Sequence, residues 1–361
     1  MGPNIQERDR MPPATRRKRR WPWFVLLGIW LPWTTLGAAS LYAARSPRLA
    51  CLLYHRFADR DNYARLTDAD ERVYTISDVR FDEQLAALRR LGYRSVTLAE
   101  AIAFIDGRGA VPEKAVLLTI DDGCRNVLRL AEPVLRRHGF SATVFITTDP
   151  AAYVFKSSVP NSERLSDDEI RRLDPAVWSV GGHGHTHRPL RDMSDAALNE
   201  ELRQSRDSLA DLTGTPPIAM AVPGNWQGPN VRAAAGRVGY THVFVSDAGF
   251  IHPQGDRHTL PRINVSGRWS LRGFEHAVSE AGVAQRRVGR MVKAVLSPVI
   301  GRTAAGAVSR RIRAWLPTRI GSFLLVQAVF ALIAISRLKK KWSDFRLMPS
   351  ASYTCQRPPA S

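Results

Sequence analysis

Short apolar runs alternate with helical stretches between residues 48 and 265, and this alternation limits the fold more than any other feature of the chain. Eight runs are strand candidates: 48–54, 95–99, 115–120, 142–147, 177–182, 218–222, 242–246 and 260–265. Short strands that are apolar on both faces and separated by helices are typical of a buried parallel sheet. Seven or eight such units in about 220 residues favour a β/α barrel over an open sheet.

Two of the intervening stretches show the periodicity of amphipathic helices. Residues 81–93 carry apolar side chains at 81, 85, 88 and 91. Residues 194–214 predict a longer helix, with Ser194 as its N-cap and Gly214 as its end. Both stretches support the strand–helix alternation of an α/β protein.

Two aspartates, Asp121 and Asp122, directly follow the apolar run 115–120, and Gly123 comes next. The residues that act in a β/α barrel lie where its strands end, and glycine lets the chain turn sharply there. Two adjacent carboxylates repel each other unless a cation lies beside them. Taken alone, the pair is more typical of an ordinary polar turn.

Three histidines follow another apolar run, 177–182: His183, His185 and His187. Imidazole is a common ligand of borderline divalent metals. One carboxylate and two imidazoles would hold such an ion, a donor set that suits zinc, and leave room for a water whose pKa falls to about 7. The second carboxylate would then be placed to act as a general base.

The segments "TIDDG" (119–123) and "HGHTH" (183–187) resemble the first two motifs of the polysaccharide deacetylases, the NodB-like carbohydrate esterases. This resemblance implies a distorted (β/α)7-8 barrel as the catalytic domain, over residues 49–280. It implies that Asp121 is the catalytic base. It also implies a divalent metal ion, with zinc preferred, held by Asp122, His183 and His187, while His185 occupies the variable position of the motif.

The stretch "LLYHRFADR" (52–60) resembles the opening of exopolysaccharide N-deacetylases that act on poly-N-acetylglucosamine, in which the barrel is circularly permuted. In that branch the histidine that ends the first strand is the general acid. The resemblance therefore implies this role for His55, because an amine leaves poorly unless it is protonated. The alternative is a structural histidine bonded to the barrel rim.

The third motif of the family departs from its pattern here. It reads "AVPGNW" (221–226), with Ala221 in place of the arginine that normally orients the base. Arg262, near the end of a late strand, is a candidate substitute, and without one the activity would be low. The candidate substrate-binding residues are Pro223, Gly224, Trp226 and Arg262; the alternative for Trp226 is packing at the rim.

The net charge of +19 lies almost entirely in the two flanks of the chain. Residues 1–48 carry +7 and residues 281–361 carry +14, which leaves −2 for residues 49–280. A nucleic-acid enzyme usually has its basic excess on the working domain, so nucleic acid is not an expected partner. Basic residues beside apolar segments instead suggest anionic membrane lipid.

The N-terminus predicts a membrane anchor. A basic cytoplasmic tail, residues 1–20, precedes 24 uncharged residues at 21–44 that contain four tryptophans. This length spans a bilayer, and the positive charge before it keeps the tail in the cytoplasm. A cleaved signal peptide is the alternative. Either way, the catalytic domain is expected to face the periplasm or cell exterior, at the cytoplasmic membrane if the anchor is retained.

The C-terminal part, residues 281–361, is a basic extension. Apolar residues between 288 and 296 recur at helical spacing, which fits either a helix on a membrane surface or an ordinary packed helix. Residues 320–336 are uncharged and are either a short second crossing or a surface or core helix. The chain is thus expected to be single-pass or two-pass.

These observations predict a metal-dependent hydrolase that removes N-acetyl groups from amino sugars of a surface or exported polysaccharide. One alternative keeps the site but cleaves an O-acetyl ester or another amide. A second alternative is a weakly active, membrane-tethered glycan-binding protein in polysaccharide export.

Overall fold

The computed structural model describes residues 47–315 of the chain. The predicted tail 1–20, the predicted anchor 21–44 and the segment 320–336 lie outside the described residues. None of the helices between residues 47 and 315 combines the length and the apolar character that a membrane crossing requires.

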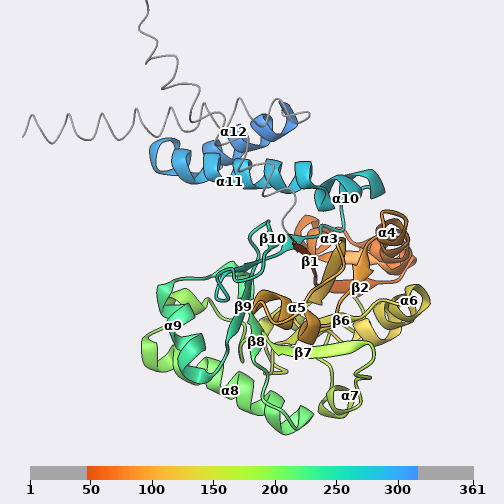
Figure 1. The fold of residues 1–361 in the computed structure, drawn as a ribbon, viewed down its shortest axis with the longest axis vertical. Helices are drawn as coiled ribbons and strands as arrows, with labels where there is room; N and C mark the ends of the chain where they lie inside the picture. Colours follow the sequence, from red (N-terminus) through yellow and green to blue (C-terminus); the bar gives the residue numbers. More distant parts are fainter. Residues whose placement is uncertain (1–46, 316–361) are drawn as a thin grey trace, which may run out of the picture. The chain divides into compact units, whose positions relative to one another are not determined.

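The fold is built on a mainly parallel sheet with helices between its strands (Figure 1). The six principal strands are all parallel neighbours, in the order β1 (Leu49–Tyr54), β5 (Ala115–Ile120), β6 (Ala142–Ile146), β7 (Trp178–Gly182), β8 (Ala219–Ala221) and β9 (His242–Val245). Shorter strands at the margins are β4 (Arg94–Ser95) and β10 (Phe250–Ile251). The predicted α/β class is confirmed.

One short segment links the two ends of this sheet. β11 (Leu260–Pro261) pairs in parallel with β9, and β12 (Ile263–Asn264) pairs in parallel with β1. The two strands are separated only by Arg262, so residues 260–264 connect the last principal strand to the first. The sheet therefore curves into a nearly closed barrel, as the strand count predicts.

Alternate residues of the strands fill the inside of the barrel. Leu49 and Cys51 of β1 and Leu117 of β5 belong to one buried apolar cluster with Phe145 and Phe244. Buried residues of α5 (Leu98–Ile105), near the centre of Figure 1, belong to the same cluster. Because side chains alternate along a strand, the series 115, 117 and 119 continues inward to Asp121. This register carries Asp121 to the end of the interior core.

Other helices pack outside the strands. They are α4 (Asp78–Arg90), α6 (Glu132–His138), α7 (Asp167–Arg171), α8 (Asp195–Thr213), α9 (Pro229–Val238) and α10 (Leu271–Val278), with a π-helical turn η1 (Val127–Ala131) before α6 and 3-10 turns η2 (Tyr153–Phe155), η3 (Leu190–Asp192) and η4 (Pro223–Asn225). The predicted ends of α8 are confirmed, because the Ser194 hydroxyl accepts from the Ala197 amide and Gly214 adopts the left-handed C-cap conformation.

The strand predicted at 95–99 is mostly wrong. Only Ser95 of that run is in a strand, in β4, and the chain turns into helix α5 at Thr97. Thr97 and Glu100 form a capping box, in which each side chain accepts from the backbone amide of the other residue. This local signal for a helix start outweighs the β-branched character of the run.

Between β1 and α4 the chain inserts a small layer that the sequence did not predict. It contains a parallel pair, β2 (Arg56–Ala58) with β3 (Thr75–Ser77), and two six-residue helices, α2 (Arg60–Arg65) and α3 (Ala69–Tyr74). Asp59 and Asp68 cap the two helices through their carboxylates. Neither helix contains a fully buried residue, which is why no apolar period marks them.

The chain continues beyond α10 as two helices, α11 (Glu280–Ile300) and α12 (Arg302–Trp315). Val288 and Val292 of α11 are buried, and the Ser309 hydroxyl of α12 donates to the Gly289 carbonyl at 2.6 Å. Of the two alternatives for this stretch, the structure favours an ordinary packed helix, since α12 covers part of its apolar face.

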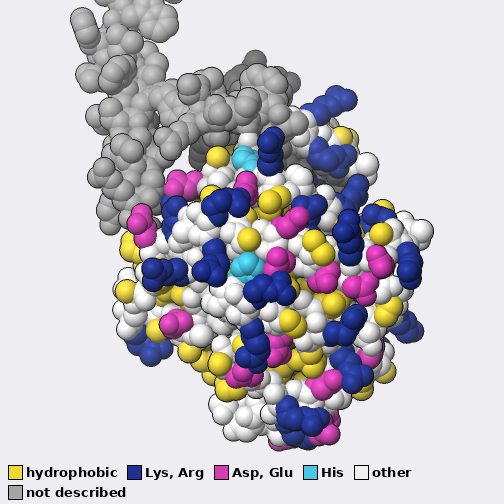
Figure 2. Space-filling view, turned by 90° about the vertical axis from the view of Figure 1, so that its right-hand side faces the viewer, with side chains coloured by type: hydrophobic (Ala, Val, Ile, Leu, Met, Phe, Trp, Pro, Cys, Tyr) yellow, Lys and Arg dark blue, Asp and Glu magenta, His cyan; other side chains and the backbone are white. Residues whose placement is uncertain are grey.

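The surface agrees with the near-neutral charge of residues 49–280. Figure 2 shows basic and acidic side chains interspersed over the face that it presents, with no extended area of one sign. This mixture is unlike the continuous basic stripe of a nucleic-acid-binding face.

Candidate active site

Asp121, directly after β5, is held by a buried arginine. The Arg262 guanidinium donates to both carboxylate oxygens of Asp121, at 2.6 Å and 2.8 Å, and Arg262 is completely buried. Burial by itself would raise the pKa of Asp121, but the positive charge of Arg262 and the neighbouring His183 keep it below its ordinary value. Asp121 is therefore an ionised, rigidly oriented carboxylate.

The next residue, Asp122, faces two imidazoles. Its Oδ1 atom lies 3.6 Å from Nε2 of His183 and 3.5 Å from Nε2 of His187. His183 follows β7, and its Nδ1 donates to the Ala221 carbonyl at 2.9 Å, so Nε2 is the nitrogen with a free lone pair. Burial would raise the pKa of Asp122, but the two imidazoles hold it well below its ordinary value.

Two of these three residues adopt backbone conformations that ordinary residues avoid. Asp122 has a φ of 75° and His187 has a φ of 59°. A non-glycine residue in this region costs about 1–3 kcal/mol, and such residues are concentrated at functional sites. The strain turns both side chains toward one point in the cavity.

The loop that carries His187 is fixed from below by a glutamate. One carboxylate oxygen of Glu201, in α8, accepts from the backbone amides of His185 and Thr186 at 2.8 Å and 2.6 Å. Its other oxygen accepts from the Thr186 hydroxyl at 2.9 Å. Glu201 thus defines the path of the chain between His183 and His187.

The strand before this loop is glycine-rich for a steric reason. A Cβ atom on Gly182 would lie 2.2 Å from the Tyr240 hydroxyl, and one on Gly181 would lie 2.4 Å from the Phe145 ring. Larger residues would push β7 away from these aromatic rings and would displace His183 with it.

The donor set fits a divalent metal ion. Oδ1 of Asp122 is buried and has no hydrogen-bond partner among the described residues, although two imidazole nitrogens face it. The separations of 3.5 Å and 3.6 Å are too long for hydrogen bonds. Ligand atoms about 2.0–2.2 Å from a tetrahedral ion lie roughly 3.3–3.6 Å apart. The two separations from Asp122 Oδ1 fall in this range. Asp122, His183 and His187 can therefore hold one ion together.

His55, directly after β1, completes the polar end of this cavity. It is packed edge to face on Tyr74, with ring centroids 4.9 Å apart, and its Nδ1 atom is buried without a hydrogen-bond partner among the described residues. Burial lowers its pKa to about 4, although Asp122 and Asp121 oppose this shift. The ring is therefore neutral at physiological pH.

These residues line a cavity of 490 Å³. Asp121, Asp122, His183 and His187 lie together in it, as the two motifs predict, and His55 lies with them, as the resemblance of the stretch 52–60 implies. Gly224 and Trp226 also line it, and the Trp226 ring lies 6.3 Å from the His187 ring. The cavity is open to solvent and large enough for a sugar unit.

The other predicted contact residues lie elsewhere. Arg262 does not line the cavity but is bonded to Asp121, so its position supports the orienting role and not contact with substrate. Pro223 is buried and lies outside the lining. His185 does not line the cavity, and its Nδ1 is bonded to the Thr148 hydroxyl at 2.8 Å.

Tyr153 and Glu201 contribute to this site although the sequence did not point to them. Tyr153 lines the cavity, and its hydroxyl lies 3.1 Å from Nδ1 of His187. Glu201 supports the histidine loop from within a helix. Tyr153 lies in the long segment that follows β6, at the end of the barrel that carries the site. Its place after a strand could have indicated that it lies near the site. Nothing in the sequence marks Glu201 among the acids of α8.

Comparison with known families agrees with this geometry. The sequence model of the polysaccharide deacetylase family matches residues 108–243, which include both the aspartate pair and the histidine loop. This chain contains a polysaccharide deacetylase domain. The expectation that it is an enzyme of this family is confirmed. His55 and Arg262 of the deacetylase lie outside the matched residues. The pairing of the strands beside them brings both residues to the site.

Curated relatives are similar over most of their own length. The poly-beta-1,6-N-acetyl-D-glucosamine N-deacetylase of Staphylococcus epidermidis is 23% identical over 229 residues, which are 60% of this chain and 78% of that protein. A putative polysaccharide deacetylase of Bacillus subtilis, YxkH, is 21% identical over 237 residues, which are 66% of this chain and 78% of that protein.

Solved structures share the fold. The Streptococcus pyogenes deacetylase PplD, in complex with acetate, has a TM-score of 0.55 at 19% identity and covers 65% of this chain and 99% of its own. IcaB from Ammonifex degensii has a TM-score of 0.52 at 24% identity and covers 66% of this chain and 97% of its own.

Proposed function

We propose that this deacetylase is a metal-dependent hydrolase that removes N-acetyl groups from amino sugars of a surface or exported polysaccharide. One observation carries the proposal: an unsatisfied buried carboxylate oxygen of Asp122 faces two imidazole nitrogens, beside a second carboxylate that is clamped by arginine. The amide specificity is supported by the relatives named as N-acetylglucosamine N-deacetylases.

The proposed metal ligands are Asp122, His183 and His187, and the N and O donors suit zinc. A divalent ion bound there would activate a water molecule and polarise the acetyl carbonyl. The chain fixes the ligand atoms in advance through the Ala221 carbonyl, Glu201 and the strained backbone at Asp122 and His187.

Asp121 is the proposed general base. Arg262 holds its carboxylate in one orientation and in the ionised form, which is the form that accepts a proton from water. Arg262 would thus perform the orienting role that the resemblance assigns to the arginine of the third motif. Its pairing with Asp121 weakens the alternative of a weakly active glycan-binding protein, because that alternative depended on a missing arginine.

His55 is the proposed donor of the proton that the departing amine requires. Its ring is neutral in the resting site, because burial lowers its pKa to about 4. The proton that Asp121 accepts from water can protonate this ring, which then gives it to the departing amine. Its unpartnered Nδ1 is available for this transfer.

The test is acetate release from N-acetylglucosamine oligomers by the full chain, before and after treatment with a chelator. We expect release that the chelator abolishes and that added zinc restores. Asp121→Asn should abolish release while leaving bound metal. Release that persists in the variant, or that chelation does not change, would refute the proposal. O-acetylated oligomers run in parallel test the ester alternative.

We also propose that the catalytic domain faces the periplasm or cell exterior, tethered at the cytoplasmic membrane by residues 21–44, with membrane lipid beside its basic flanks. The support is the sequence: arginines and a lysine at 16–20 directly precede the uncharged stretch. A phosphatase reporter that is active only after export, fused after residue 48, should be active. An expressed but inactive fusion would contradict this orientation.

A further inference from the structure

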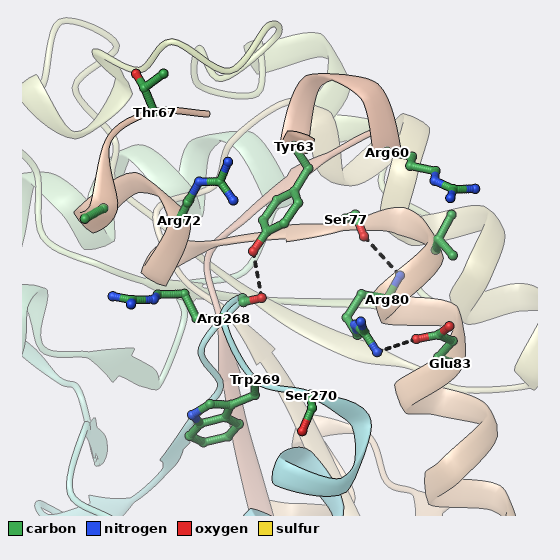
Figure 3. Close-up of a pocket in the computed structure, with 13 residues that line it drawn as sticks. Arg60, Tyr63, Thr67, Arg72, Ser77, Arg80, Glu83, Arg268, Trp269 and Ser270 are labelled. Atoms are coloured by element: carbon green, nitrogen blue, oxygen red, sulfur yellow. Dashed lines mark hydrogen bonds and ion pairs between the residues drawn. The ribbon is translucent and has the colours of Figure 1, made fainter. Parts of the chain in front are cut away.

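A second cavity, of 860 Å³, lies beside the inserted layer between β1 and α4. It is lined by residues of α2 and α3, by the first two turns of α4 and by the loop before α10 (Figure 3). It shares no lining residue with the candidate active site. The proposed hydrolysis makes no use of it.

Four arginines line this second cavity: Arg60, Arg72, Arg80 and Arg268. The only acid in the lining is Glu83, which pairs with Arg80 at 2.7 Å, so the lining carries a net charge of +3. Arg72 is bonded to neutral carbonyls, those of Leu66 and Ala64. An unneutralised cluster of guanidinium groups is a binding site for carboxylate or phosphate.

Arg60 and Arg268 are the most available members of this cluster. Both are exposed, and neither side chain has an ion pair or hydrogen bond among the described residues. In Figure 3 they lie on opposite sides of the pocket, with Tyr63 and Arg80 between them. Their guanidinium groups point away from each other in Figure 3, so each is open to an anionic group at its own end of the pocket.

The backbone adds to this positive potential. Ser77 is the N-cap of the 13-residue helix α4, and Ser270 is the N-cap of α10, and both serines line the cavity. The N-terminal end of a helix carries partial positive charge and favours anions. Two helix N-termini therefore open into the same cavity as the four arginines.

Aromatic rings give the cavity a preference beyond charge. Tyr63 and Trp269 line it, and the Tyr63 hydroxyl is anchored to the Gly267 carbonyl at 2.7 Å. Rigid aromatic side chains offer large contact area at low entropic cost. They suit the apolar face of a sugar ring better than a bare inorganic anion, which needs only the charged groups.

Helix α3 separates this cavity from the candidate active site. Arg72 lines the second cavity and Tyr74 lines the active site. Two positions apart on a helix, side chains point in directions about 200° apart, so the two residues are on opposite sides of α3. A glycan that lies across this single helix would reach both cavities at once.

We propose that the second cavity binds an acidic group, a carboxylate or phosphate, on a sugar unit of the same glycan whose acetyl group lies in the active site. This inference rests on the proposed function, since it takes the glycan to be the substrate. It predicts a preference for acidic polysaccharides over neutral ones, set by a site remote from the reacting atoms.

The test compares two probes that both contain N-acetylglucosamine: a hyaluronan octasaccharide, in which every second unit carries a carboxylate, and a neutral chitin oligomer of the same length. We expect the full chain to bind the acidic oligomer about tenfold more tightly by calorimetry at low salt, and to lose this margin in the double variant R60A/R268A and at high salt. The neutral oligomer should bind the double variant and the wild type equally.

The matched control is R65A/R94A, which removes two exposed arginines that line neither cavity. This control variant should still bind the acidic oligomer more tightly than the neutral one, by the same factor as the wild type. Equal binding of the two oligomers by the wild type, or the same loss in the control, would overturn the proposal. The proposal would also be overturned if Arg60 and Arg268 were required for binding phosphatidylglycerol vesicles or inorganic phosphate but not for binding the acidic oligomer.

Because binding is measured directly, the two proposals fail separately. If the chain releases no acetate from any glycan but still binds the acidic oligomer more tightly than the neutral one, the proposed hydrolysis is refuted and the proposed binding of an acidic group is not. A chain that releases acetate and binds both oligomers equally refutes the acidic site alone.

Discussion

Arg262 and Asp121 are 141 residues apart in the chain, yet the guanidinium donates to both oxygens of the carboxylate in a fully buried pair. The pairing explains how Asp121, the proposed base, can be kept in position although Ala221 stands where the third motif has an arginine. It also makes the base dependent on the strand segment that joins β9 to β1.

Replacing Arg262 is expected to be costly for both stability and activity. R262M leaves the Asp121 charge buried without a partner, so the free energy of unfolding should fall by about 3–5 kcal/mol. The measurement is urea unfolding, together with acetate release. The double variant D121N/R262M should lose much less than the two single variants added together. Additive losses would mean that the pair does not interact as described.

Metal binding should distinguish two histidines that are two positions apart. H187Q removes a proposed ligand and should lose bound metal, whereas H185Q removes a ring bonded to Thr148 and should keep it. Metal at about 100 times its Kd should raise the free energy of unfolding by about 2.7 kcal/mol in the wild type and in H185Q. Thermal unfolding with and without chelator measures this, and equal responses of the two variants would contradict the assignment.

Glu201 is expected to act as a positioning residue for the histidine loop. E201A removes the acceptor for the His185 and Thr186 amides, so metal affinity should fall by about 10–100-fold. A competition titration against a fluorescent chelator measures the affinity. E200A, which removes an exposed acid of the same helix, is the control and should leave the affinity intact. An unchanged affinity in E201A would show that the loop holds its shape without this carboxylate.

The glycines of β7 allow a test of packing. A Cβ on Gly182 would lie 2.2 Å from the Tyr240 hydroxyl, so G182A should lower the free energy of unfolding by about 1–3 kcal/mol. G306A, in helix α12, meets no atom closer than 3.7 Å and should be neutral or slightly stabilising. Urea unfolding of both variants makes the comparison. A neutral G182A would mean that Tyr240 moves aside freely.

The sequence predicted the parts of this protein whose signals are local. Apolar runs marked β1, β5, β6 and β7, and Ser194 and Gly214 marked the two ends of α8. The resemblance of two motifs to the polysaccharide deacetylases implied that Asp122, His183 and His187 form one group, and the structure brings these three together. Each of these signals is carried by a few neighbouring residues.

What the sequence did not predict depends on contacts between distant segments. The sequence offered Arg262 as a candidate for orienting the base, but its contact with Asp121 depends on residues 260–264 pairing on both sides, with β9 and with β1. The inserted helices α2 and α3 were missed because their residues are only partly buried. Capping at Thr97 turned an apparent strand into a helix, since hydrogen bonds at a helix start outweigh a weak strand propensity.

The segment 260–264 also sets an order of events during synthesis. The aspartate pair and the histidines leave the ribosome well before Arg262 does. The Asp121 carboxylate of the nascent protein therefore has no arginine partner until residues 260–264 are made. A truncated product that ends before residue 260 would have all the proposed metal-binding side chains, but its proposed base would not be oriented by Arg262. Catalytic competence is thus deferred until the barrel can be fully assembled.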